Sequence, residues 1–391
     1  KGVNSIKADF YNAYFLKEYS KTFDYNMLIN AEYINQYNYN IQKEHPSQED
    51  KMKYAPVLIP TLCRDDKFIR CMESLRRNSW AGHTEIYIGV DYPTKESHWQ
   101  GYRRICTYLD QDFPEFAAVH VVKRPRNLGA GKNSDALKEW IFERHDRYIY
   151  TDDDMEFSPN FLEYIDKTME LYEEDPKVFA VCGYSYPLPW DVSEKSNLYA
   201  SATGCFMWGT GFWRDKYLPI RYALQNGVLR KEYATGDRQV WKKKLIDARY
   251  LDFLGLGISE EKGFLDAASD VGISTYMELF DRYAIIPVLS KARNYGFDGT
   301  GEWCQRSTAK EFNALNYAYA DQVIDTECSF EPRPDTFYHE IENRRIWAAF
   351  DCRKNMKCRV FVLEMKHLLW VFLGEKGYQK LKALLKPKGN T

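Results

Sequence analysis

The sequence predicts an α/β fold in which a doubly wound, mostly parallel sheet carries helices on both faces. Three observations lead to this prediction. The 391 residues are 45% hydrophobic and 28% charged, which is the composition of an ordinary globular protein. From residue 55 onward, short apolar runs alternate with segments whose apolar residues recur at helical spacing. The connections between the runs are long enough for the crossovers that parallel strands require.

Each element can be placed on the sequence. We expect strands at 55–60, 85–90, 118–122 and 147–151, alternating with helices at 67–78, 97–110 and 131–145. A further helix starts near Pro159 with Ser158 as its N-cap, because Pro is favoured in the first helical turn and Ser at the cap. After residue 178 the alternation gives way to Gly- and Trp-rich segments, which are typical of functional loops.

Charge is balanced over the whole chain but not along it. With 54 Lys and Arg against 56 Asp and Glu, the formal net charge is -2, which gives no general case for binding nucleic acid. Residues 353–391 carry ten Lys or Arg and two Asp or Glu, which gives this segment a net charge of +8. The net charge of residues 1–352 is therefore -10. This tail is either a solvated terminal helix or a segment that attaches to an anionic membrane surface. The apolar residues Trp370 and Phe372 favour attachment.

The cysteine and histidine patterns exclude two other classes of protein. Nine cysteines at irregular spacings contain no C-x-x-C pair, so neither a disulfide framework nor a zinc module is indicated, and a reducing compartment fits best. The seven histidines lack the H-E-x-x-H spacing of zinc hydrolases.

An acidic triplet, Asp152, Asp153 and Asp154, directly follows the strand predicted at 147–151. Three adjacent carboxylates repel one another unless a cation or hydrogen-bond donors neutralise them. Mg2+ and Mn2+ bind carboxylate oxygens together with substrate phosphates, so such a cluster at the ligand end of a sheet fits a nucleotide-diphosphate site. The alternative is a solvated acidic turn before the next helix, and the triplet alone does not decide between the two.

The ends of the other strands favour the nucleotide site. In a parallel sheet, these ends lie along the same rim as the aspartates, and ligands bind beyond that rim. An arginine with a carboxylate can hold a nucleobase and ribose, while a glycine-flanked loop that ends in lysine brings backbone N–H groups and a cation to phosphates. The predicted nucleotide-sugar-binding residues at these ends are Pro60, Thr61 and Arg64 after the first strand, Asp91 after the second, and Asn127, Gly129 and Lys132 after the third.

The order of these motifs resembles the nucleotide-sugar half of a GT-A fold glycosyltransferase, whose D-x-D signature the aspartates match. The triplet continues into Met155, Glu156 and Pro159, and the segment Trp208-Gly209-x-Gly211-Phe212-Trp213 follows. This combination is similar to the inverting N-acetylglucosaminyltransferase I class and to bacterial surface-polysaccharide glycosyltransferases, over roughly residues 55–305. Asp152 stands where the animal enzymes of that class carry Glu. This difference leaves the metal-binding role of the triplet unchanged, but it does not identify the donor sugar.

The resemblance implies a role for each matched residue. Asp154 would bind the metal, Mn2+ or Mg2+, while Asp152 and Asp153 would contact the sugar, the ribose or the metal's waters. Arg64 and Asp91 would hold the uracil and the ribose. The remaining implied contacts are a floor beneath the donor sugar from Trp208, Gly209 and Gly211, a loop from Gly296 to Gly301 that closes over the donor phosphates, and Arg293 at the diphosphate.

Inverting transfer needs one carboxylate base that accepts the proton of the attacking hydroxyl. In the bacterial relatives a Trp-Asp motif precedes an Asn-x-Gly-Phe segment by one helix and one strand. The counterpart here is Ser269-Asp270, then a helix at 271–282, a strand at 284–288 and Asn294-Tyr295-Gly296-Phe297. We therefore predict Asp270 as the base, with Asp237 as its rival. The alternative is that Asp270 only caps the following helix.

The expected function is an inverting, metal-dependent transfer of a sugar from a UDP-sugar to a glycan or lipid-linked glycan. We place it in bacterial surface-polysaccharide synthesis, in the cytoplasm and peripherally on the inner face of the membrane. The predicted division is an N-terminal extension (1–54), a nucleotide-sugar half (55–178), an acceptor and catalytic half (179–305) and a basic helical region (306–391). Two alternatives are a nucleotidyltransferase that makes a sugar nucleotide and an inactive nucleotide- or glycan-binding protein.

Overall fold

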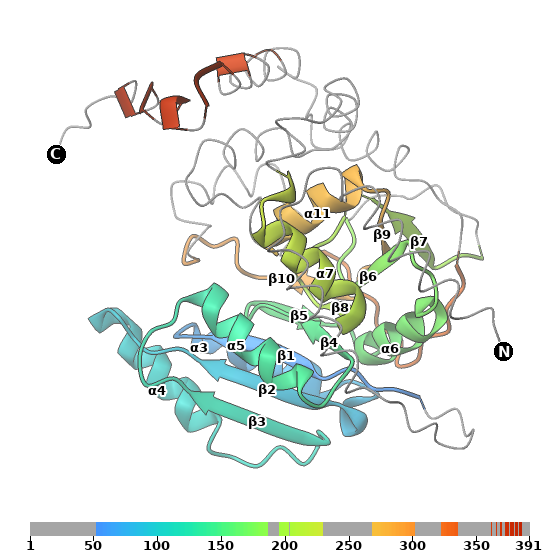
Figure 1. Ribbon diagram of the computed structural model, residues 1–391. Coiled ribbons are helices and arrows are strands. Elements are labelled where there is room, and N and C mark those ends of the chain that lie inside the picture. The colour runs from blue at the N-terminus through green and yellow to red at the C-terminus, as the bar shows by residue number, and fades with distance from the viewer. Residues whose placement is uncertain are drawn as a thin grey trace. The chain divides into compact units, whose positions relative to one another are not determined.

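A computed structural model of the chain is shown in Figure 1. It describes residues 52–186, 195–202, 204–229, 268–301 and 322–334, together with single positions and short runs between 361 and 384. The chain divides into two compact units, Lys1–Lys51 and Met52–Thr391, and all described residues belong to the second. Nearly all of the predicted extension at 1–54, most of the predicted region at 306–391 and Asp237 lie outside the described residues.

The first half of the large sheet is parallel, as predicted. β1 (Val57–Thr61), β2 (Glu85–Val90), β3 (Ala118–Lys123) and β4 (Arg147–Tyr150) lie in the order β3-β2-β1-β4. The connections carry α3 (Asp65–Arg76), α4 (Trp99–Tyr108) and α5 (Ala130–Phe142), with short 3-10 turns η1 (Ala81–His83) and η2 (Glu96–His98). Because crossovers are right-handed and the strand order reverses after β3, α5 covers the face opposite α3 and α4.

The second half of the sheet mixes directions. β8 (Thr210–Trp213) runs antiparallel between β4 and β6 (Val178–Cys182), β9 (Tyr283–Pro287) pairs parallel with β6, and β7 (Leu198–Ser201) pairs antiparallel with β9. The helices of this half are α6 (Phe161–Tyr172), α7 (Arg214–Gln225) and α11 (Asp270–Leu279), and β5 (Met155–Phe157) forms a separate antiparallel pair with β10 (Ala292–Asn294). Within the described residues, four of the seven pairings in the large sheet are parallel, which confirms the predicted mostly parallel α/β fold.

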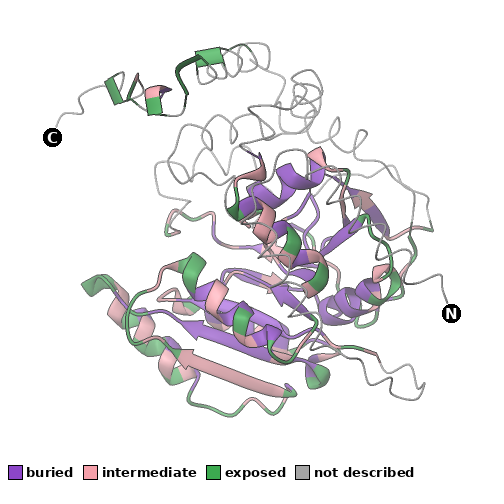
Figure 2. Cartoon of the chain, viewed as in Figure 1, coloured by how far each residue is buried: buried purple, intermediate pink, exposed green. Residues whose placement is uncertain are grey.

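Burial is greatest at the centre of the sheet. Every residue of β1 is buried, whereas the edge strand β3 is only partly covered, as Figure 2 shows. Strands that are covered on both faces read as continuous apolar runs, which explains why β1 was recognisable from sequence. At the junction of the two halves, the rings of Tyr148 on β4 and Phe212 on β8 stack with centroids 5.4 Å apart. The ends of β1 and β4 therefore project from a tightly packed platform.

The predicted N-cap of the helix after the triplet is wrong by two residues. α6 begins at Phe161, and the carbonyl of Asn160 accepts the first helical hydrogen bond from the Tyr164 N–H at 2.9 Å, so Asn160 is the N-cap. Ser158 instead donates its hydroxyl to the Asn160 side chain at 3.0 Å. The Asn160 side chain makes no capping hydrogen bond and donates instead to Asp325 at 3.1 Å and to the Ser329 carbonyl at 3.0 Å. Pro159 consequently precedes the helix rather than lying in its first turn.

Asp166 on α6 is a buried acid whose ionisation should make the stability of the fold depend on pH. Its buried carboxyl group accepts a hydrogen bond from the Ala55 N–H at 2.9 Å, and its Oδ2 has no partner among the described residues. Burial raises the pKa of Asp166 from 3.8 to about 8. A raised folded-state pKa stabilises the fold fully below the unfolded pKa, and this contribution is lost as the pH rises through the folded pKa.

We expect Asp166→Asn to flatten the pH dependence of stability. The free energy of unfolding of the parent should fall by about 1 kcal/mol per pH unit between pH 4 and 8 relative to the variant, because in this range the unfolded parent ionises Asp166 while the folded parent keeps it protonated. Urea unfolding of both proteins from about pH 4.5 to about pH 9 measures the difference. Curves that run parallel over this range would contradict the assignment.

Candidate functional site

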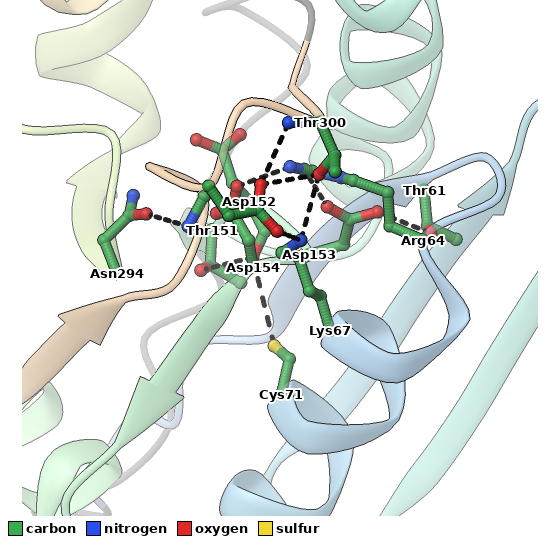
Figure 3. Close-up of polar contacts among 12 residues, drawn as sticks. Thr61, Arg64, Lys67, Cys71, Thr151, Asp152, Asp153, Asp154, Asn294 and Thr300 are labelled. Atoms are coloured by element: carbon green, nitrogen blue, oxygen red, sulfur yellow. Dashed lines mark hydrogen bonds and ion pairs between the residues drawn. The ribbon is translucent and has the colours of Figure 1, made fainter. Parts of the chain in front are cut away.

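The carboxyl ends of β1 and β4 bring four of the predicted residues into contact, as Figure 3 shows. Thr61, the last residue of β1, donates its hydroxyl to Asp153 Oδ2 at 2.7 Å. Arg64 donates from Nη1 to Asp154 Oδ2 at 2.8 Å and from Nη2 to Asp153 Oδ1. Both carboxylates are buried. The structure therefore places Thr61, Arg64, Asp153 and Asp154 together on the rim where ligands of such sheets bind.

Arg64 reaches the aspartates because α3 begins directly behind β1. Its carbonyl accepts the Phe68 N–H at 2.9 Å, so Arg64 is the N-cap of α3. Gly101 of α4 packs against the same turn, where a Cβ atom would lie only 1.8 Å from the Cys63 carbonyl oxygen. The turn that carries Arg64 is therefore held by its own helix and by α4.

Full ionisation of the triplet is costly in this environment. Burial, and then the charge of Asp154, raises the pKa of Asp152 to about 8, although the Tyr150 hydroxyl donates to Asp152 at 3.0 Å. Burial also raises the pKa of Asp153, against the opposing effect of Arg64. Since Arg64 brings one positive charge to three carboxyl groups, a second cation would stabilise their ionised forms.

One oxygen of Asp154 stands outside this network. Its Oδ1 is buried and has no hydrogen-bond partner among the described residues. A buried polar atom without a partner is costly unless a ligand or an ion satisfies it. A divalent cation that takes one or two carboxylates and completes its shell with waters and substrate phosphates fits this atom. In the described part of the chain, no three His, Cys, Asp or Glu side chains form a metal site by themselves, so such a cation needs those further ligands.

The segment from β10 to Gly301 lies against the triplet. The Tyr295 N–H donates to the Asp154 carbonyl oxygen at 2.9 Å. At Gly296 a Cβ atom would lie 2.1 Å from Asp154 Oδ2, so the close approach of backbone to carboxylate requires glycine. The loop predicted at 296–301 is therefore adjacent to the aspartates, and its closure over a donor stays a prediction.

Lys67 links this loop to α3 through an ion pair and a hydrogen bond. This residue was not identified from the sequence. Its buried Nζ forms an ion pair with Asp298 and donates to the Thr300 hydroxyl at 3.0 Å (Figure 3). The partners are 231 and 233 residues away along the chain, and no local pattern marks such a pair. The helical spacing of α3, which puts Arg64 and Lys67 one turn apart, was the one available signal.

We expect Lys67→Met to loosen the loop without unfolding the protein. Loss of the ion pair and hydrogen bond should speed backbone amide exchange in residues 295–301 by at least about tenfold, since opening would cost less free energy. Hydrogen–deuterium exchange read by mass spectrometry measures this. Lys123→Met, which removes an exposed pair with Asp110, is the matched control and should leave the loop unchanged. Equal exchange in both variants would show that Lys67 does not hold the loop.

Arg293 on β10 is engaged within the protein. Its guanidinium donates to the Tyr295 hydroxyl at 3.1 Å and lies 3.9 Å from the Glu156 carboxylate across the β5–β10 pair. Tyr295 in turn donates to Glu156 at 2.9 Å. Arg293 Nε is buried and has no partner in the described ranges. A diphosphate contact by Arg293 stays a prediction.

Asp91 organises the loop that follows β3. Its carboxylate accepts the backbone N–H groups of Gly129 and of the preceding residue, each at 2.8 Å. Gly129, with a φ of +78°, precedes α5, and Asn127 donates its side-chain amide to the Tyr92 carbonyl at 2.7 Å. Lys132 is exposed in the first turn of α5. The structure thus brings Asp91 together with the predicted phosphate loop, and its carboxylate accepts backbone N–H groups of that loop and of Tyr92, the last at 2.9 Å.

The Gly- and Trp-rich segment forms β8 and the turn before it. Trp208 precedes the strand and packs edge-on against Phe297 of the neighbouring loop, with ring centroids 5.9 Å apart. Gly209 has a φ of +73°, and a Cβ there would lie 2.6 Å from the Phe157 ring. A Cβ at Gly211 would likewise collide with α6. Both glycines therefore serve packing, while Trp208 is the member of the segment beside the loop at 296–301.

Asp270 is the first residue of α11 and is exposed. The N-cap is Ser269, whose side chain accepts the Gly272 N–H at 3.3 Å, so the capping role does not fall to Asp270. The helix and the strand predicted after it are present as α11 and β9. The role of Asp270 as the base stays a prediction.

Comparisons with known proteins add a likeness in fold. No protein-family profile matches this sequence, and no curated protein matches it either. Among solved structures, the chain is similar to S. aureus TarS 1–349, with 12% identity, a TM-score of 0.38, and coverage of 83% of this chain and 80% of that chain. Identities this low say nothing of activity, which has to be argued from the site.

Two further structures show a similar degree of likeness. One is the mannosyltransferase PcManGT from Pyrobaculum calidifontis in complex with GDP-Man and Mn2+, with 13% identity, a TM-score of 0.35, and coverage of 86% of this chain and 94% of that chain. The other is GalNAc-T7 with UDP, GalNAc and Mn2+, with 10% identity and a TM-score of 0.36. The match covers 68% of this chain and 48% of that chain.

Proposed function

We propose that this protein is an inverting, metal-dependent glycosyltransferase that uses a UDP-sugar and a glycan or lipid-linked glycan acceptor. One observation carries the proposal. Thr61, Arg64 and the triplet converge at the ends of β1 and β4, where Asp154 keeps one buried oxygen without a partner among the described residues. A rim site of this kind suits a divalent cation together with the diphosphate that the cation carries.

The residues of the rim would divide the work of binding. Asp154 would hold Mn2+ or Mg2+, and the cation, when bound, supplies positive charge to the departing diphosphate. Asp152 and Asp153 would accept hydrogen bonds from hydroxyl groups of the donor. The loop shaped by Asp91 and the exposed Lys132 would offer N–H groups and a positive charge to the donor phosphates.

Asp270 is the proposed base for the acceptor. Asp270 is an exposed carboxylate at the start of α11, so an acceptor hydroxyl in solution can reach it. The acceptor oxygen would form a bond to the anomeric carbon while the bond from that carbon to the phosphate oxygen breaks. The hydroxyl proton passes to Asp270 and UDP leaves, and a single displacement inverts the configuration.

The proposal is tested by nucleotide release. The purified chain is incubated with a panel of UDP-sugars, and with one GDP-sugar for comparison, in Mn2+, in Mg2+ or in EDTA; slow hydrolysis needs no acceptor. We expect one UDP-sugar to be cleaved only with metal. Pyrophosphate formed from UTP and a sugar phosphate would instead show a nucleotidyltransferase. Metal-dependent UDP binding without cleavage would show an inactive binding protein, and no binding at all would overturn the proposal.

We also propose that the tail attaches the enzyme peripherally to the inner face of the cytoplasmic membrane. Among the described residues, no helix is long and apolar enough to cross a membrane. Several described tail positions are helical and exposed, and Phe372 is 89% exposed. Net charge over 353–391 is +8, which complements an anionic surface. The exposed apolar side chains whose spacing puts them on one helix face are Phe361, Met365, Leu368, Leu369 and Phe372.

Vesicle co-flotation tests this attachment. We expect binding to vesicles that contain phosphatidylglycerol, little binding to phosphatidylcholine alone, and weaker binding in high salt, because the charges are screened. Phe372→Ser should weaken binding, whereas Val323→Ser, which changes an apolar residue that is 72% exposed elsewhere, should not. Equal behaviour of the two variants would contradict a role for the tail.

A further inference from the structure

We infer that Arg64 is the internal counter-ion of the triplet in the metal-free protein, and that a divalent cation must displace it from Asp154 to bind. The inference rests on the metal-binding part of the proposed function and not on sugar transfer.

The geometry of Arg64 is that of a counter-ion. Its two terminal nitrogens contact different aspartates, Asp153 and Asp154, so one guanidinium bridges two carboxylates. The Arg64 side chain is three-quarters buried, and the carboxylates of Asp153 and Asp154 are nine-tenths buried or more. Charges that are removed from water need partners close by, and Arg64 is the cation that contacts these two in the described residues. The network is thus complete without a metal except at Asp154 Oδ1.

A metal and this position of Arg64 compete for the same carboxylate. Asp154 has two oxygens, and Arg64 holds Oδ2 while Oδ1 is buried without a partner in the described ranges. A divalent cation on Oδ1 would stand beside the guanidinium, and like charges at such separations repel strongly where water is scarce. Arg64 therefore has to move away from Asp154 when the metal binds.

Displacement gives Arg64 a second use. A guanidinium that no longer contacts the carboxylates can donate its coplanar N–H groups in pairs to phosphate oxygens or to the edge of a nucleobase. Arg64 is the N-cap of α3 and lies on the same rim as the triplet, so a change of its side-chain rotamer would turn the guanidinium from Asp154 toward a nucleotide bound at that rim. Metal binding would thus free the group that the nucleotide needs, and the two ligands would favour each other's binding.

The test is Mn2+ affinity without any nucleotide, measured on the 391-residue chain by the electron paramagnetic resonance signal of free Mn2+. We expect Arg64→Met to bind Mn2+ at least about tenfold more tightly than the parent, because the competing charge is gone. Arg104→Met is the matched control. It removes an exposed cation that pairs with Asp65, the neighbour of Arg64, and should change the affinity by less than about threefold.

Thermal unfolding gives a second readout that does not depend on activity. Metal-free Arg64→Met should melt below the parent, because two buried carboxylates lose their partner, and Mn2+ should raise its melting temperature more than that of the parent. If Arg64→Met does not fold even with Mn2+, Arg64→Gln replaces it in both measurements. Mn2+ affinity equal to or weaker than that of the parent in a folded variant would overturn the inference, as would absence of Mn2+ binding to the parent. Tighter binding without cleavage of any sugar nucleotide would sustain it and reject sugar transfer.

Discussion

Asp154→Asn should lower metal-dependent release of UDP by about 1,000-fold, because it removes the charge from the oxygen best placed to hold the cation. The amide has nearly the same shape as the carboxyl group, so the contact with Arg64 and the fold should survive. The rate of UDP release at saturating donor and Mn2+ measures the loss, and Mn2+ affinity should fall in parallel.

The control for this substitution is Asp110→Asn. Asp110 pairs with Lys123 at 3.2 Å on the surface, away from the triplet, and its side chain is well exposed. The same chemical change there should leave the rate and the metal affinity of the parent intact. An Asp154→Asn enzyme with undiminished, metal-dependent turnover would show that another group holds the cation.

Gly101→Ala should destabilise the fold by at least about 2 kcal/mol, a large effect for one methyl group. The added Cβ would lie 1.8 Å from the Cys63 carbonyl oxygen and 3.0 Å from Asp65 Oδ1, so α4 and the turn behind β1 must separate. In an unhindered helix the same change is stabilising. The midpoint of urea unfolding measures the effect. Because Arg64 lies on that turn, Mn2+ affinity should change as well.

Gly131→Ala is the matched comparison within the same protein. Gly131 lies in α5, and nothing lies within 4 Å of a Cβ built there. Alanine should therefore stabilise the protein by up to about 1 kcal/mol through its helix propensity. If both substitutions destabilise the protein alike, the collision at Gly101 is not the cause.

Local patterns were enough to predict the parallel half of the sheet. β2 coincides with the strand expected at 85–90, and β1, β3 and β4 differ from expectation by one or two residues at their ends. Their apolar runs and the helical spacing between them are properties of short stretches of sequence. Parallel strands end at the same edge of a sheet. Strand direction was therefore enough to predict that Thr61, Arg64, Asp153 and Asp154 lie at one edge.

Contacts between segments that are far apart in the chain could not be predicted from the sequence. Trp208 to Trp213 read as a functional loop because it is rich in Gly and Trp, whereas residues 210–213 form the buried strand β8. Glycines that suit a flexible turn also suit a strand packed tightly against a helix, as Gly211 packs on α6. The same limit applies to Lys67, whose partners at Asp298 and Thr300 come near only after folding.

The antiparallel insertion of β8 limits how the molecule can move. β8 is hydrogen-bonded to β4 on one side and to β6 on the other, with Thr210 opposite Tyr150 just before the triplet. Rotating one half of the sheet against the other would break these ladders, so the described strands leave no hinge between the halves. We expect any opening near the triplet to be confined to surface segments such as 295–301, so that the distance between Trp208 and the aspartates stays nearly constant.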